Sequence, residues 1–291
     1  MATVYLNGSF VAKDQARVSV DDRGYVFGDG IYEVVRVIEG QIFDWPGHAE
    51  RMARGLREVR IGFSAADVDA LEAVCYTLLA DNDLKAGEAT IYLQVTRGAA
   101  PRLHHFPPAD TPPGVYAAPS RFTPSRDMRE KGIAAIVQPD IRWSRCDIKT
   151  INLMGAVLAR QAAREAGAYE SLLIRDGMLT EGAATNAFVA VDGVFRTFPL
   201  SNYILPGITR SHVIAAARDA GVEVVEEPVT QQQLMAAREV FVAGTTTDVA
   251  PVVTLDGKPV GDGKPGALTR RVQEAFLARL YAGAPAAPAA R

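Results

Sequence analysis

The chain has 291 residues, 48% of them hydrophobic and 22% charged, which is the composition of a soluble protein with one large domain or two domains of ordinary size. Its formal net charge of −3 gives no electrostatic case for a nucleic-acid partner, and no apolar run reaches the roughly 18 residues of a membrane helix. Two cysteines, Cys75 and Cys146, and an N-terminus without a basic leader or an apolar segment indicate a cytoplasmic protein without a disulfide framework.

The first part of the chain mixes hairpin signals with amphipathic helices. Two dipeptides that favour positive φ predict hairpin turns, namely Asn7-Gly8 and Glu39-Gly40. Ser64, with Asp67 three residues later, predicts the capped start of a helix over 65–82. Apolar periodicity predicts a helix over 48–61, and β-branched and aromatic residues predict a strand over 89–97.

Strands and helices interleave in the second part, with a further hairpin expected at Asp192-Gly193. The strands expected here span 132–138, 169–175, 222–229 and 240–244, and the helices span 150–166, 207–221, 231–240 and 266–281. Because tight hairpins join several strands, we expect mixed sheets, an α/β (α+β) fold, rather than a parallel doubly wound sheet. The domains expected are a small N-terminal one over 1–119, a linker over 120–131, a larger C-terminal one over 132–282 and a disordered tail over 283–291.

Lys149 stands out in a chain that uses arginine for most of its positive charge. It is flanked by Ile148 and Ile151, just before the helix expected over 150–166. A surface lysine at a first helical turn is the ordinary explanation, although a cation there opposes the helix dipole. A desolvated lysine has a lowered pKa and is able to form a Schiff base. Spacing alone does not choose between the two.

Glu181 lies in the segment "TEGAATNAF", beside Gly182 and ahead of the strand that begins near Ala187. One interpretation is a solvated hairpin glutamate. The other is a carboxylate held against a ring nitrogen, which keeps that nitrogen protonated so that a cofactor works as an electron sink.

An anion site is indicated by the segment "LPGITR", because a helix beginning near Ile208 offers the free N–H groups of Ile208 and Thr209. A threonine run over 245–247 adds hydroxyl donors. His48 and Arg51 share one helix face, and an arginine is able to bind a phosphate through two hydrogen bonds. Each signal is weak by itself, since helix starts and threonine runs are common.

A carboxylate-binding pair is indicated by "RGAAPRLHHFPP", where Arg102 and His104 point the same way in extended chain. An ordinary charged loop is the alternative. Tyr32 alternates with Val34 and Arg36 along one strand face, where a core tyrosine is the alternative. The histidines show no metal-ligand spacing, so we expect no metal, and no GxSxG nucleophile elbow occurs.

Several of these stretches occur in one order that resembles a known family. They are "DDRGYVFGDGIYEVVRV", "YLQVTRGAAPRLHHFP", "DIRWSRCDIKTINLMGAVLARQ", "TEGAATN" and "LPGITR". The chain is similar to fold type IV pyridoxal-phosphate aminotransferases, most of all to the D-amino-acid aminotransferases among them. The resemblance runs from the first hairpin to about Tyr281 and implies the two-domain architecture of that family.

The resemblance also implies a role for each candidate residue. Lys149 matches the lysine that forms a Schiff base with pyridoxal 5′-phosphate and then moves a proton between the substrate Cα and the cofactor C4′. Glu181 matches the carboxylate facing the pyridinium nitrogen, and Arg142 the residue near the phenolic oxygen. The phosphate-binding set is matched by Arg51, the backbone of Ile208 and Thr209, and Thr245.

The substrate side of the family site is matched as well. The residues matching the set that holds the substrate α-carboxylate in D-specific members are Tyr32, Arg102 and His104. The resemblance implies a homodimer in which Arg102 and His104 reach in from the neighbouring subunit. Val34 and Leu205 match residues that shape the side-chain pocket.

Two positions bear on the subfamily. Met154 stands five residues after the lysine, where branched-chain aminotransferases carry a tyrosine, and their substrate loop lacks the arginine-x-histidine arrangement. Both points favour the D-specific members. Ala183 and Ala184 depart from the serines that D-specific relatives often have, so backbone or water must replace those contacts with the cofactor.

The expected activity is a ping-pong transamination from a D-amino acid, D-alanine or D-glutamate in type, to a 2-oxo acid. The alternatives are an L-branched-chain aminotransferase, an (R)-amine transaminase and an aminodeoxychorismate lyase, which share the lysine, the glutamate and the phosphate-binding set. A non-catalytic cofactor carrier is a further alternative, but a carrier needs no substrate clamp.

Overall fold

The computed structural model describes residues 2–282, which form two compact units. Unit 1 contains the described residues up to Thr123 together with Ile148–Asn152, and unit 2 contains Pro124–Asp147 and Leu153–Ala282. The chain therefore changes unit within the linker expected over 120–131. That linker includes the end of a strand and a short helix, and the expected boundaries do not anticipate that 148–152 joins unit 1. The tail expected over 283–291 lies outside the described residues.

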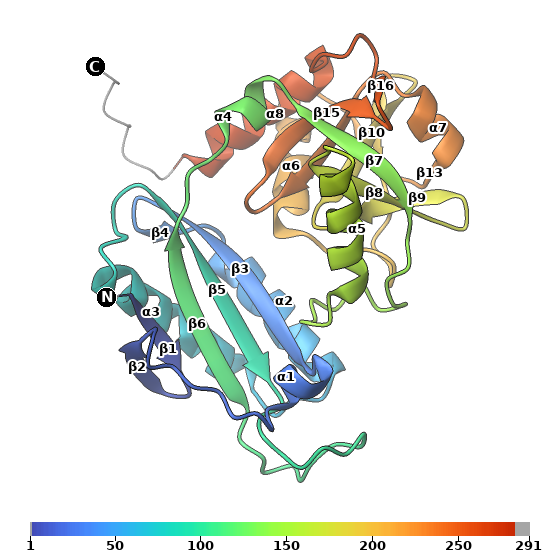
Figure 1. The fold of residues 1–291 in the computed structure, drawn as a ribbon. Coiled ribbons are helices and arrows are strands. Elements are labelled where there is room, and N and C mark those ends of the chain that lie inside the picture. Colours follow the sequence, from blue (N-terminus) through green and yellow to red (C-terminus); the bar gives the residue numbers. More distant parts are fainter. Residues whose placement is uncertain (1, 283–291) are drawn as a thin grey trace. The chain divides into compact units, whose positions relative to one another are not determined.

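Unit 1 is built on an antiparallel sheet with the strand order β2-β1-β6-β5-β3-β4 (Figure 1). Both predicted hairpin turns are confirmed, because Leu6 pairs with Ser9 and Ile38 pairs with Gln41. The strands are β1 (Thr3–Leu6), β2 (Ser9–Ala12), β3 (Gly30–Ile38), β4 (Gln41–Ile42), β5 (Glu88–Thr96) and β6 (Gly114–Arg121). The helices are α1 (Arg23–Phe27), α2 (Trp45–Glu58) and α3 (Ala65–Asp81).

The core of unit 1 lies between this sheet and helices α2 and α3. Leu56 of α2 and Leu78 of α3 pack in one cluster with Ile91 and Leu93 of β5, and each of these four side chains is at most 1% exposed. The predicted capping box of α3 is confirmed by the reciprocal hydrogen bonds of Ser64 and Asp67. Because successive strand residues point to opposite faces of the sheet, every second side chain of β3 points away from α2 and α3.

Unit 2 is built on a mixed sheet with the order β12-β11-β10-β14-β15-β7-β8-β9-β13, and β16 pairs with β15. Strand β7 runs parallel to both β15 and β8, whereas β8 and β9 are antiparallel, so the mixed sheets predicted from the sequence are confirmed. The strands are β7 (Ile133–Pro139), β8 (Glu170–Arg175), β9 (Met178–Gly182), β10 (Asn186–Val191), β11 (Val194–Thr197), β12 (Val224–Glu226), β13 (Val229–Thr230), β14 (Val240–Gly244), β15 (Asp248–Leu255) and β16 (Lys258–Pro259). The helices are α4 (Arg126–Glu130), α5 (Met154–Glu165), α6 (Ile208–Asp219), α7 (Gln231–Ala236) and α8 (Ala267–Leu280).

Three predicted elements of this part were wrong in their bounds, one of them the helix expected over 231–240, which ends at Ala236 as α7. Helix α5 begins at Met154, not at 150, because Thr150 forms a bridge with Ile31 and Ile151 donates its N–H to the carbonyl of Gly30. The single strand predicted over 222–229 is two strands, β12 and β13, which pair with β11 and β9 respectively. Pro228 stands between them and has no N–H to continue the ladder. Within residues 2–282, the structure contains no helix long and apolar enough to cross a membrane.

Candidate active site

Lys149 is held against the start of strand β3 in unit 1. The Tyr32 N–H donates to the Lys149 carbonyl at 3.0 Å, and the Lys149 Nζ lies 4.3 Å from the centre of the Tyr32 ring. Ile148, next to the lysine, is 4% exposed and belongs to the core of unit 1. The isoleucine therefore anchors the segment, while the lysine side chain lies beside the tyrosine. Lys149 is not part of a helix.

Tyr32 and Val34 lie on the β3 face opposite α2, as the sequence alternation predicts. Tyr32 stacks on Tyr92 with ring centres 5.7 Å apart, and Tyr92 is in contact with Tyr116. Burial raises the pKa of Tyr92 to about 12, so its hydroxyl stays protonated at neutral pH. The Tyr32 ring beside the lysine is therefore backed by two further tyrosine rings within unit 1.

Arg51 and His48 share one face of α2, as predicted, and both bind Glu33 of β3. Arg51 donates through Nε and Nη2 to the two Glu33 oxygens at 2.7 and 2.6 Å, and the His48 ring nitrogen lies 2.7 Å from Oε2. Burial alone would raise the pKa of Glu33, but Arg51 and His48 lower it to about 2. The orientation of Arg51 is thus set by a buried carboxylate that the sequence did not single out.

Arg102 and His104 lie in the loop between β5 and β6 and meet at one aromatic ring. The Arg102 guanidinium carbon is 5.2 Å from the centre of the Phe27 ring, and the His104 ring centre is 5.6 Å from it. Both side chains are exposed. The prediction that these two residues point the same way is in accord with their shared contact with Phe27 of α1.

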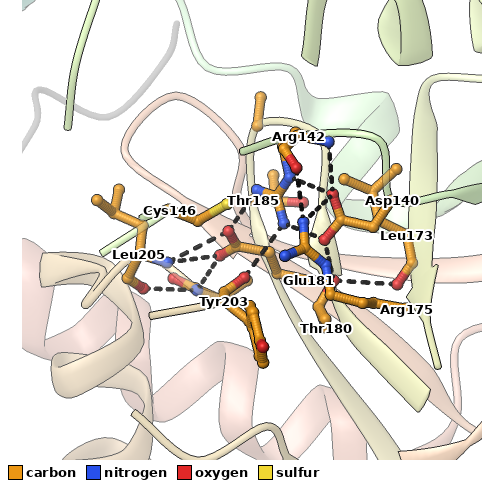
Figure 2. A network of polar contacts seen from close by, with 12 residues as sticks. Asp140, Arg142, Cys146, Leu173, Arg175, Thr180, Glu181, Thr185, Tyr203 and Leu205 are labelled. Atoms are coloured by element: carbon orange, nitrogen blue, oxygen red, sulfur yellow. Dashed lines mark hydrogen bonds and ion pairs between the residues drawn. The ribbon is translucent and has the colours of Figure 1, made fainter. Parts of the chain in front are cut away.

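Glu181 is buried near the end of β9 in unit 2, so it is no solvated hairpin residue (Figure 2). Its Oε1 accepts from Arg142 Nη1 at 2.6 Å, and its Oε2 accepts from Asn186 Nδ2 at 2.8 Å. The Leu205 N–H lies 3.1–3.2 Å from both oxygens. Burial raises the pKa of Glu181 to about 7, against the opposing effect of Arg142.

Arg142 is clamped between two carboxylates, Asp140 and Glu181, as Figure 2 shows. Its Nε and Nη2 each donate to a different Asp140 oxygen at 2.9 Å. Asp140 also pairs with Arg175 at 3.2 Å and accepts from the Thr180 hydroxyl at 3.0 Å. Burial opposes the charge on Arg142, but Asp140 and Glu181 raise its pKa above the ordinary value, so it is a permanent cation.

The N-terminus of α6 presents Ile208 and Thr209 at its first two positions. Among the described residues, no side chain caps this helix, whose N-cap is Gly207. A Cβ at Gly207 would collide with the side-chain oxygen of Asn186, which explains the glycine. Thr245 follows directly after strand β14. The predicted helix start at Ile208 is confirmed, and its first-turn N–H groups provide a positive dipole end.

Ala183 and Ala184, where the sequence departs from the family pattern, make their contacts through backbone N–H groups. Ala183 is buried and donates its N–H to the Ser171 carbonyl at 2.9 Å, and the Ala184 N–H lies 3.4 Å from Glu170 Oε2. Thr185, the next residue, donates its hydroxyl to the same glutamate oxygen at 2.9 Å. Glu170 therefore orders the turn that follows Glu181.

Sequence reasoning missed three polar residues of the site. Asn186 connects Glu181 to the Leu205 carbonyl, Asp140 holds Arg142, and Glu33 holds Arg51. Asn186 and Asp140 lie inside the motifs "TEGAATN" and "DIRW". The sequence therefore showed these residues but not which side chains they bind. Glu33 alternates with Tyr32 on β3, and that alternation is the signal that would have placed it toward α2.

Comparison with known proteins gives consistent matches over most of the chain. The family model described as amino-transferase class IV matches residues 30–255. A D-alanine aminotransferase of Staphylococcus aureus (strain COL) is 42% identical over 276 residues, which cover 95% of this chain and 97% of that protein. A D-alanine aminotransferase of Bacillus licheniformis is 40% identical over 273 residues, which cover 94% of this chain and 95% of that protein.

A solved structure also matches both units of the fold. The branched-chain amino acid aminotransferase of Escherichia coli superposes with a TM-score of 0.88 at 28% identity, covering 94% of this chain and 93% of that one. The family model spans well over half of the 291 residues. The two D-alanine aminotransferases are 42% and 40% identical to this chain over nearly its whole length. The chain belongs to the class IV aminotransferase family.

Proposed function

We propose that this aminotransferase depends on pyridoxal 5′-phosphate and moves the amino group of a D-amino acid, such as D-alanine or D-glutamate, to a 2-oxo acid. The observation that carries a substrate carboxylate site is the placement of Arg102 and His104 side by side on Phe27, and the D configuration follows from the relatives. Two cationic or hydrogen-bonding groups so placed are suited to a carboxylate. The relatives at 40–42% identity, which are named D-alanine aminotransferases, support the same substrate class.

The residues present fit pyridoxal phosphate. Lys149 provides an amine, and Glu181 provides a buried carboxylate whose raised pKa a cationic ring nitrogen would lower again. The α6 N-terminus, with the N–H groups of Ile208 and Thr209, suits a phosphate. Arg51 and Thr245 complete the proposed phosphate set, and Arg142 is the proposed neighbour of the phenolic oxygen. A further branched-chain amino acid aminotransferase at 28% identity was solved in complex with N-(5′-phosphopyridoxyl)-L-glutamate.

When bound, the cofactor supplies an electron sink for the negative charge that develops at the substrate Cα. Lys149 would take the proton from the substrate Cα and return it during the exchange, and its place beside the Tyr32 ring limits the direction from which it acts. Arg102 and His104 hold the α-carboxylate, so they decide which face of Cα turns its proton toward Lys149. Val34 and Leu205 are the residues we propose as neighbours of the substrate side chain.

Helix α5 supplies an argument for the homodimer. Met154, Val157 and Leu158 lie on one face of this helix and are 65%, 55% and 52% exposed. Large apolar side chains grouped on one face of a helix mark an interaction surface. In the proposed dimer, Arg102 and His104 serve the site of the neighbouring subunit. We place the enzyme in the cytoplasm, because Cys75 and Cys146 are free thiols, as suits a reducing compartment.

A second candidate, an L-branched-chain aminotransferase, is favoured by the TM-score of 0.88 with the Escherichia coli enzyme. The test that separates the two is a steady-state assay with 2-oxoglutarate as acceptor and either D-alanine or L-leucine as donor. We expect glutamate and pyruvate from D-alanine and little turnover of L-leucine. Turnover of L-leucine alone would support the second candidate instead.

A further inference from the structure

The loop that carries Arg102 and His104 is tied to a buried ion cluster that the proposed reaction does not use. The cluster consists of Asp29, between α1 and β3, with Arg23 of α1 and Arg97 at the end of β5. The side chains of the three residues are 15%, 5% and 8% exposed. All three stand in the motifs "DDRGYVFGDG" and "YLQVTRGAAP", and none of them belongs to the proposed cofactor or substrate set.

Asp29 binds both arginines at hydrogen-bond distance. Arg23 Nε donates to Oδ2 at 2.8 Å, and Arg97 donates through Nε to Oδ2 at 2.8 Å and through Nη2 to Oδ1 at 3.0 Å. Burial works against the charge on Asp29, but the two arginines lower its pKa below the ordinary value. The Asp29 carboxylate therefore fixes the orientation of both the Arg23 and the Arg97 guanidinium group.

Each arginine then reaches a different point of the loop. Arg23 Nη1 donates to the carbonyl of Leu103, the residue between Arg102 and His104, at 2.6 Å. The Arg97 guanidinium carbon lies 3.7 Å from the centre of the Phe106 ring, two residues beyond His104. The Arg97 guanidinium is itself fixed, because it also donates to the carbonyls of Val59 and Arg60 at the end of α2 at 2.7 Å.

Helix α1 supplies the third contact. Arg23 lies 4.7 Å from the centre of the Phe27 ring, the same ring that Arg102 and His104 approach. The loop side chains themselves are exposed and have many rotamers, so ordering them costs conformational entropy. A backbone hydrogen bond at Leu103, between the two residues that bind substrate, lowers that cost before substrate arrives.

We propose that Asp29, acting through Arg23 and Arg97, is a positioning residue that presents Arg102 and His104 for substrate-carboxylate binding. This inference rests on the proposed function, because it assumes that Arg102 and His104 bind the α-carboxylate. Asp29 touches neither substrate nor cofactor in this account. Its loss should therefore weaken amino-acid binding and leave cofactor binding and the chemical step intact.

The test compares the holoenzymes Asp29→Asn and Arg23→Lys with wild type, with Asp21→Asn as control. Asp21 is an exposed neighbour outside the cluster. For D-alanine we expect KM to rise roughly 10- to 100-fold in both variants, the size of effect produced by a displaced positioning group. We expect kcat at saturation and the visible spectrum of the bound cofactor to stay within about twofold of wild type. Arg23→Lys keeps the charge and loses the forked geometry, so it serves if Asp29→Asn does not fold.

A double-mutant cycle with Arg102→Ala separates positioning from general stability. If Asp29 acts through the clamp, Asp29→Asn raises KM by a clearly smaller factor in the Arg102→Ala background than in wild type, because only His104 is then left to be misplaced. Full additivity, or a KM unchanged in both cluster variants while Arg102→Ala raises it, would overturn the positioning role and leave the proposed function standing. If Arg102→Ala itself leaves KM unchanged, the proposed carboxylate clamp is wrong, and the role of Asp29 is overturned with it.

Discussion

Lys149 and Tyr32 are joined by both backbone and side chain. The tyrosine N–H donates to the lysine carbonyl at 3.0 Å, and the lysine Nζ lies 4.3 Å from the centre of the tyrosine ring. The backbone bond fixes where the lysine segment meets strand β3, and the ring limits where its amine can go. A lysine that moves a proton between two fixed atoms needs this kind of fixed approach.

Replacement of Lys149 by Ala should abolish transamination. The variant lacks the amine that attaches the cofactor and moves the proton, so we expect kcat to fall by more than about a thousandfold. The visible band of lysine-bound cofactor should disappear in the same preparation. Lys131→Ala, which removes an exposed lysine paired with Asp127, is the control and should retain wild-type activity. Substantial residual turnover in Lys149→Ala would contradict the assigned role.

The neighbouring histidines give a matched pair for the carboxylate clamp. His104 contacts Phe27, whereas His105 has its ring nitrogen 3.1 Å from the Phe106 carbonyl. Loss of a hydrogen bond to a charged group costs about 1.5–3 kcal/mol, so His104→Ala should raise KM for D-alanine roughly 10- to 100-fold. Steady-state kinetics should show no such rise for His105→Ala. Equal effects in both variants would argue against a specific role of His104.

The raised pKa of Glu181 makes the stability of the cofactor-free protein depend on pH. The carboxyl has a pKa of about 7 when folded and 4.5 as its ordinary value, so the folded state binds more protons between these pH values. Stability from this group is complete below pH 4.5 and is lost as pH rises through 7, by up to about 3 kcal/mol. Urea denaturation at pH 5.5 and pH 8 should show a smaller difference for Glu181→Gln than for wild type. An unchanged difference would mean that Glu181 titrates normally.

Glu33 has the opposite dependence. Its pKa of about 2 means that its stabilisation is present above pH 4.5 and is lost as pH falls toward 2. Glu33→Gln removes the carboxylate partner of a buried cation, which typically costs about 3–5 kcal/mol of unfolding free energy. Glu50→Gln changes an exposed residue of the same helix as His48 and should cost less than about 0.5 kcal/mol. Denaturation at pH 7 measures both, and equal values would contradict the structural role of Glu33.

The exposed face of α5 predicts the oligomeric state. A charge placed in an apolar interface is costly, so Val157→Glu should shift wild-type dimers toward monomers in analytical ultracentrifugation. Met235→Glu, on helix α7 in the same unit, is the control and should leave the mass unchanged. A monomeric wild type would contradict the proposed dimer, and a dimeric Val157→Glu would place the interface elsewhere.

Local signals in the sequence were sufficient for much of the fold. Turns and helix caps depend on interactions within a few residues. The two hairpin turns at Asn7-Gly8 and Glu39-Gly40 and the helix cap formed by Ser64 and Asp67 were therefore predictable. The start of α5 was not, because pairing of Ile151 with Gly30, distant in sequence, overrides the helical pattern from 150 to 153. Tertiary pairing of this kind leaves no periodic signal.

The residues of the candidate site differ in the same way in how far the sequence could predict them. Chemistry-bearing residue types in recognisable motifs, such as Lys149 and Glu181, were evident from the sequence and the family resemblance. The residues that hold the site together were not, because Asp140, Asn186 and Glu33 act by contacts that only the fold creates. Their partners are between 2 and 40 positions away in the chain, and no motif spacing predicts such pairs.

The most direct test of the account follows the visible absorbance of the purified, cofactor-loaded enzyme while D-alanine or L-leucine is added without an acceptor. The account predicts that D-alanine converts lysine-bound cofactor to its shorter-wavelength aminated form, and that L-leucine at the same concentration does not. Conversion by L-leucine alone would contradict the D-specific clamp of Arg102 and His104. An enzyme without a lysine-bound cofactor band would contradict the role of Lys149 itself.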